Sequence, residues 1–157
     1  MTFILNDRSS ARKFFHCNFY AMMFSMYVGL VAILAIPSIL DVLVHTKKSS
    51  SSLTAYRRYM QTIYHTLSWF RSDLKPGTRA WRSLENVRKF HGAASRSAMN
   101  AKVGMISQRD LVITQFGFMG FAVLSQKEAG VQGKREEIED FCHLWRVLGF
   151  MIGIKDE

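Results

Sequence analysis

The chain has 157 residues, of which 48% are hydrophobic and 21% are charged, and its formal net charge is +9. This length suits one domain with a substantial core. Two prolines, ten glycines and the lack of strand-like alternation favour an all-α protein. Cys17 and Cys142 have neither CxxC nor metal-finger spacing, which excludes a disulfide scaffold.

The basic residues are concentrated in the first two thirds of the chain. Residues 1–102 carry fifteen Lys and Arg against four Asp and Glu, whereas residues 103–157 carry six against eight. The cations are scattered, and no nucleic-acid-binding motif accompanies them. We therefore expect no nucleic-acid partner, although the charge would suit an anionic membrane surface.

A polar, basic segment at residues 1–18 precedes a long apolar stretch. Residues 19–36 form eighteen uncharged positions, and the uncharged run continues to Leu40. Such a helix is just long enough to cross a bilayer, but a buried core helix has the same hydropathy. Pro37 and Asp41 place a kink and a charge near its end. The apolar helix 19–40 is thus either a membrane span or a core helix, and the protein either membrane-associated or soluble and cytoplasmic.

The next helix is predicted from Leu53 to Phe70, with Thr54 as its N-cap. One apolar stripe, expected to be buried, consists of Leu53, Tyr56, Met60, Ile63, Leu67 and Phe70. A neighbouring line contains Arg58, Thr62, His65 and Trp69. Arg58 and Thr62 either present a cation and a hydroxyl to an anionic or polar ligand, or form a solvated edge.

A turn at residues 73–78 leads to a helix that Ser83 is expected to cap. Its apolar stripe consists of Leu84, Val87, His91, Ala94 and Ala98. His91 should therefore point inward, either as a core residue or as a metal ligand. Gly92 and Ala93 lie beside it, so the surrounding wall is low enough for a flat ligand.

Two more helices complete the predicted bundle. Ser107 to Asp110 has the form of a capping box, and the helix that follows should run to about Ser125, buried nearly all round. Gly117 and Gly120 would let another helix or a planar ligand approach its backbone. The last helix should span residues 134–149, and the chain ends on further apolar residues, as expected for a C-terminally truncated piece of a larger helical domain.

Four blocks of the chain, in order, resemble the family that contains rubber oxygenase and the endoplasmic-reticulum-bound oxygenase of mycophenolic acid biosynthesis. The resemblance covers residues 19–157, which would be the N-terminal part of the catalytic domain. The blocks are YRRYMQT (56–62), VRKFH (87–91), ISQRDLVITQFGF (106–118) and WRVLGFMIGIKD (145–156).

This resemblance implies an all-α, haem b-dependent oxygenase that cleaves a C=C double bond of a hydrophobic, isoprenoid substrate with molecular oxygen. It makes His91, in R-x-x-H, the proximal iron ligand. It places Arg58 and Thr62 at the haem as catalytic and cofactor-binding residues. It also suggests the endoplasmic reticulum membrane as the location.

Gln61 departs from the family pattern, because rubber oxygenase has a lysine there that can occupy the distal face of the iron. A neutral amide is a poorer ligand, so we expect an open or water-occupied distal site. The alternative function is a membrane-anchored helical interaction protein that keeps the fold without the chemistry, so the sequence leaves open whether the protein is an enzyme.

Overall fold

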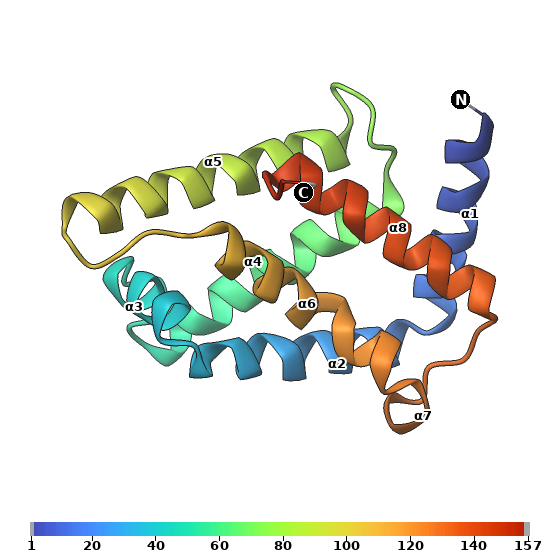
Figure 1. Cartoon of the computed structure of the whole chain (residues 1–157), viewed down its shortest axis with the longest axis horizontal. Coiled ribbons are helices and arrows are strands. Elements are labelled where there is room, and N and C mark those ends of the chain that lie inside the picture. Colours follow the sequence, from blue (N-terminus) through green and yellow to red (C-terminus); the bar gives the residue numbers. More distant parts are fainter. Residues whose placement is uncertain (1, 156–157) are drawn as a thin grey trace. The chain divides into compact units, whose positions relative to one another are not determined.

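The computed structural model describes residues 2–155, and within that range it contains helices and no strand (Figure 1). The predicted all-α fold is confirmed. The elements are α1 (Thr2–Cys17), α2 (Phe19–Ala32), the 3₁₀ turn η1 (Ile33–Ala35), α3 (Pro37–His45), α4 (Ser52–Arg71), α5 (Arg79–Asn100), α6 (Gln108–Leu124), α7 (Gln126–Ala129) and α8 (Arg135–Ile152).

The chain divides into two compact units, each described here by itself. Unit 1 comprises Met1–Ile33, Leu111–Phe150 and Ile154–Glu157, and unit 2 comprises Leu34–Asp110 and Met151–Gly153. Unit 1 therefore contains α1, α2, α7 and nearly all of α6 and α8, whereas unit 2 contains α3, α4 and α5. The candidate ligand residues all lie in unit 2.

The core of unit 1 forms where aromatic residues of α1 and α8 meet. Phe14 and Phe141 are both fully buried, with ring centroids 5.3 Å apart in an edge-to-face arrangement. Asn18, between α1 and α2, fastens this core to the segment before α8. Its amide nitrogen donates to the carbonyl of Gln132 (2.7 Å), and its amide oxygen accepts from the Gln132 backbone N–H (2.7 Å).

Helices α2 and α6 approach each other closely at a pair of glycines. A Cβ atom on Gly29 would collide with the backbone carbonyl of Gly117, and one on Gly117 would lie 3.2 Å from the oxygen of Gly29. The expected close approach at Gly117 is therefore made by a helix. The prediction that α6 is buried nearly all round is wrong, because Val112, Phe116 and Leu124 are exposed.

The apolar stretch 19–40 is not one helix. α2 ends at Ala32, η1 follows, and α3 begins at Pro37, which suits a first helical position because it has no N–H to satisfy. Ile36 before it is extended (φ −96°, ψ 113°), as the proline ring requires. The sequence placed the disturbance at Pro37, but the α-helix has already ended five residues earlier, at Ala32.

None of the helices in the described part of the chain is both long and apolar enough to cross a membrane by itself. Ser9–Cys17 and Phe19–Ala35 meet the length and composition criteria together, but they are bent by 85° at their junction. The choice between core and membrane for residues 19–40 stays a prediction.

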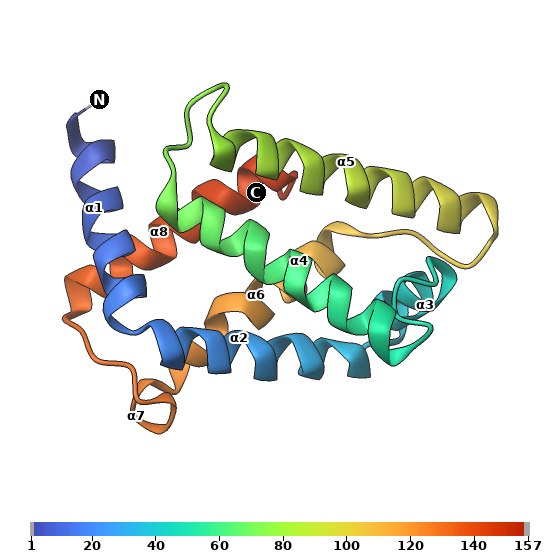
Figure 2. The same ribbon diagram turned by 180° about the vertical axis from the view of Figure 1, so that it is seen from behind.

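In unit 2, α4 and α5 lie side by side as an antiparallel pair joined by residues 72–78, as both ribbon views show (Figure 2). The N-cap of α4 is Ser51 rather than Thr54, and Thr54 closes the capping box from the third helical position. Thr78, not Ser83, caps α5. α4 therefore begins one residue before the predicted Leu53, whereas α5 begins several residues before Ser83, which is left for another role.

The predicted capping box before α6 is confirmed. The Ser107 hydroxyl accepts from the backbone N–H of Asp110 (3.1 Å), and the Asp110 carboxylate accepts from the backbone N–H of Ser107 (2.9 Å). The Asp110 carboxylate also accepts from Ser38 of α3 (2.6 Å). Burial alone would raise the pKa of Asp110, but the hydrogen bonds from Ser38 and Ser107 and the charge of Arg109 lower it. The charged carboxylate thus joins α3 to the start of α6.

The glycine contact of unit 1 yields a stability prediction. Gly29→Ala should lower the free energy of unfolding by about 1–3 kcal/mol, because the new methyl group forces two helix backbones apart. Urea titration followed by circular dichroism measures this. Gly92→Ala is the matched control, since its Cβ meets only the end of the Arg96 side chain (3.2 Å). It should be neutral or stabilise by up to about 1 kcal/mol. Equal effects of the two substitutions would contradict the assigned contact.

Candidate functional site

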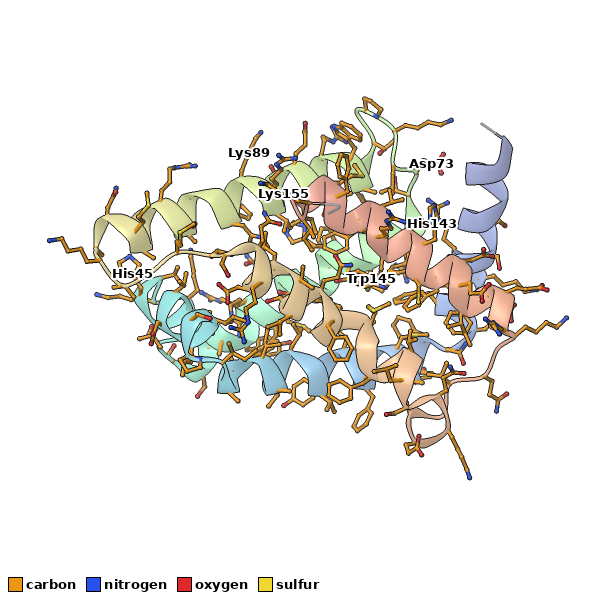
Figure 3. The ribbon with its side chains drawn as sticks, in the orientation of Figure 1. His45, Asp73, Lys89, His143, Trp145 and Lys155 are labelled. Carbon is orange, nitrogen blue, oxygen red and sulfur yellow. The ribbon has the colours of Figure 1, made fainter. Side chains whose placement is uncertain are left out.

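The predicted inward stripe of α5 is present. Leu84 and Ala98 at its two ends are completely buried, and Val87, His91 and Ala94 between them are half-buried. Lys89, two positions before His91 and therefore on another side of the helix, is exposed and points away from α5 (Figure 3). The helix thus turns the imidazole of His91 inward and leaves its neighbouring cation in solvent.

His91 is chemically unusual because burial lowers its pKa, so the imidazole is neutral near pH 7. Its Nδ1 atom has essentially no accessible surface and no hydrogen-bond partner among the described residues. An unpaired buried nitrogen costs about 1–3 kcal/mol. The imidazole therefore has a ring nitrogen that protein donors and acceptors do not satisfy.

The wall beside His91 is as low as the sequence predicted. A Cβ on Gly92 would meet only the end of the flexible Arg96 side chain. Ala94, one turn further on, contributes only a methyl group. The α5 backbone at Gly92 and Ala94 is therefore covered by little side-chain volume of its own.

On α4, Arg58 and Thr62 are close together, but each already has a protein partner. The Arg58 Nε donates to the hydroxyl of Ser49 (2.8 Å), and its guanidinium lies 4.3 Å from the ring centroid of Tyr59. The Thr62 hydroxyl donates to the carbonyl of Arg58 (3.0 Å). Both side chains are half-buried, whereas Gln61 is exposed. Within the described part of the chain, no hydrogen bond joins these residues to His91.

A buried serine that the sequence assigned to a helix cap fixes α4 against α5. The Ser83 hydroxyl accepts from the indole N–H of Trp69 (2.9 Å) and shares a hydrogen bond with Nδ1 of His65 (2.6 Å). Burial also lowers the pKa of His65, so this imidazole is neutral as well. His65 and Trp69 share one face of α4 at a spacing of four, but nothing in a linear pattern pairs them with Ser83.

This serine contact sets the register of the helix pair. His91 lies eight residues after Ser83, about 12 Å along α5, and Arg58 lies seven residues before His65, about 10 Å along α4. Because the helices are antiparallel, the step from Ser83 to His91 along α5 and the step from His65 back to Arg58 along α4 run in the same direction. Arg58 and His91 therefore stand at nearly the same level of the pair, with Thr62 about one turn away.

Three of the sequence blocks singled out above converge in unit 2. The Arg88 guanidinium donates to the carbonyl of Met151 (3.5 Å), and the Gln108 amide donates to the carbonyl of Gly153 (3.0 Å). Gly153 has a φ of 117°, which favours glycine there. Arg88 of the R-x-x-H motif therefore holds the end of the chain's last helix rather than pointing to His91.

Among the described residues, no group of three or more His, Cys, Asp and Glu side chains gathers as it would around a metal ion. A metal held entirely by side chains has no support in that part of the chain. Haem iron needs fewer protein ligands, because a single histidine can hold it.

The two neutral histidines make stability depend on pH. Their lowered pKa values mean that, below the ordinary value of 6.5, the unfolded chain binds protons that the folded chain does not. Stability is complete well above pH 6.5 and falls as the pH drops below that value. The fall is at most about 1.4 kcal/mol per pH unit for His91, and it is smaller for His65, which is more exposed to solvent. Urea unfolding across this range checks it. His91→Leu should flatten the dependence, and an unchanged slope in that variant would contradict the burial effect.

Comparison with known proteins identifies the family to which the chain belongs. The model of the family described as "ER-bound oxygenase mpaB/B'/Rubber oxygenase, catalytic domain" matches residues 15–157. A search of curated proteins and a search of solved structures found no match. The family match extends over most of the chain and includes His91, Arg58, Gln61 and Thr62. The chain therefore belongs to the family of the ER-bound and rubber oxygenases, within their catalytic domain.

Proposed function

We propose that this protein is a haem b-dependent oxygenase in which His91 would hold the haem iron. Membership of the family supports an oxygenase, and the haem assignment is our own. The observation that carries it is the state of His91, a neutral imidazole with a buried nitrogen that has no partner among the described residues.

The residues around His91 fit such a group. Iron binding requires an unprotonated nitrogen, and burial keeps the imidazole unprotonated near pH 7. The low wall at Gly92 and Ala94 leaves space for a flat macrocycle. Haem would supply oxygen activation, while the chain supplies the ligand, an apolar surrounding and the polar groups of α4.

Arg58 and Thr62 are proposed to orient the haem or its reaction partner. Arg58 stands at the level of His91, and a guanidinium pairs well with a carboxylate such as a haem propionate. To do so it would exchange its present bond to the Ser49 hydroxyl for a charge-assisted one. Thr62 already donates its proton to the Arg58 carbonyl, so its oxygen is left as an acceptor.

Gln61 is proposed to leave the iron without a distal protein ligand. It stands where rubber oxygenase has a lysine, and here it is exposed on α4. An exposed neutral amide has neither the basicity nor the burial of an amine ligand. The distal position would therefore be open or occupied by water.

The substrates are proposed to be molecular oxygen and a hydrophobic compound, with an isoprenoid C=C double bond as the group cleaved. The family supports oxygen and an organic substrate, and the apolar helical surroundings favour a hydrophobic one. The endoplasmic reticulum membrane is the proposed location, because the family description includes ER-bound members.

The test is haem binding by the purified chain. Haem added to the wild-type protein should produce a Soret band without the features of six-coordinate, low-spin amine ligation. His91→Ala should lose the Soret band that stays with the protein after gel filtration, because no other side chain is proposed to hold the iron. Visible absorption during haem titration measures both.

His143→Ala is the matched control, since His143 is exposed on α8 while Trp145 leaves that helix on another side and is buried (Figure 3). This variant should bind haem as the wild type does. A full Soret band in folded His91→Ala would refute the ligand assignment. A colourless, folded wild-type protein would instead support the alternative of a helical interaction protein without this chemistry.

A further inference from the structure

An apolar surface lies exposed on α4 where the sequence predicts a buried one. Leu53, Tyr56 and Met60 belong to the predicted stripe, and Tyr64 follows them one turn after Met60. The exposed fractions of these four residues are 57%, 61%, 41% and 57%. We call these four residues the α4 face. Further along α4 the predicted stripe does become buried, at Phe70. The N-terminal two thirds of the helix therefore present large apolar side chains to solvent.

The charge around the α4 face has one sign. Unit 2 contains thirteen Lys and Arg against four Asp and Glu, a net charge of +9, whereas unit 1 contains eight of each. α4 itself has no acidic residue. Arg57 is exposed beside the α4 face, and Lys47 and Lys48 are exposed in the turn before the helix. The whole excess charge of the protein thus belongs to the unit that carries the exposed stripe.

The turn with these lysines is held against α4. The Arg58 Nε donates to the Ser49 hydroxyl (2.8 Å), and the Ser51 hydroxyl and Thr54 close the capping box at the helix start. The backbone of this turn therefore stays at the start of α4, because the capping box persists even if Arg58 exchanges its bond to Ser49. Cations on and just before a helix that exposes tyrosines and aliphatic residues are typical of a helix that lies in a membrane interface.

We propose that the α4 face binds the surface of an anionic lipid bilayer, with α4 lying in the interface. Leu53 and Met60 would enter the acyl boundary, and the two tyrosines would sit at headgroup level. Lys47, Lys48 and Arg57 would pair with lipid phosphates and carboxylates. Nucleic acid would leave Leu53 and Met60 without apolar contacts, so lipid fits the composition of the face better.

This inference rests on the membrane location proposed above and names its contact surface. It does not depend on the haem assignment. Vesicle binding can fail while the haem spectrum is as expected, and the reverse also holds. The two proposals are therefore tested separately.

The experiment is cosedimentation of the full chain with vesicles. Vesicles of equal parts phosphatidylcholine and phosphatidylserine should bind the protein, and pure phosphatidylcholine should bind it at least about tenfold more weakly. Replacing Lys47, Lys48 and Arg57 together by Gln should weaken binding to the anionic vesicles by about five-fold for each charge removed. Replacing Leu53, Met60 and Tyr64 together by Ser should weaken it at least about tenfold.

The control replaces Tyr20, Phe24 and Tyr27 by Ser. These residues form an exposed stripe of similar size on α2, in the unit whose charges balance. Binding should persist in this variant, and circular dichroism should show that every variant is folded. Equal binding to both kinds of vesicle would overturn the proposal. Loss of vesicle binding in the α2 variant alone would also overturn it. The same holds if substitution of the α4 face changes self-association of the protein but not its binding to vesicles.

Discussion

The hydroxyl of Ser83 is the contact on which the arrangement of unit 2 depends. It receives the indole proton of Trp69 and shares a hydrogen bond with His65, so one buried oxygen joins two residues of α4 to α5. Buried polar groups strongly favour the pairing that satisfies them, and helices that could otherwise slide acquire one register. That register sets Arg58 level with His91. The candidate site therefore depends on a serine that would not contact any ligand.

Two properties of His91, on the α5 helix of this pair, support its role as a ligand: its imidazole is neutral, and one ring nitrogen is unpaired among the described residues. Burial removes its charge, and a neutral ring has a nitrogen lone pair available. Its Nδ1 has no partner in the described part of the chain, which in a purely structural histidine would be an unrelieved cost.

Much of the fold and part of the candidate site could be predicted from the sequence, because the periodicity of apolar residues indicates which residues share a helix face. It predicted the all-α fold, the capping box at Ser107 and the inward stripe through His91. It could not state what covers a face, so Leu53, Tyr56 and Met60 were expected to be buried and are exposed. Contacts between distant segments could not be predicted either. Arg58 donates to the Ser49 hydroxyl, and Ser83 joins α4 to α5 instead of capping α5. The break before Pro37 was anticipated as a kink, yet the helix ends earlier.

The central claim is that the imidazole of residue 91 holds the cofactor, and replacing it by a free imidazole tests this most directly. His91→Gly leaves a space in the wall that Gly92 and Ala94 already make low. After haem titration and gel filtration, this variant should carry no haem Soret band, and imidazole present during the titration should restore a protein-bound band close to that of the wild type. A Soret band without imidazole would contradict the claim. So would a folded variant that imidazole fails to rescue while the wild type binds haem.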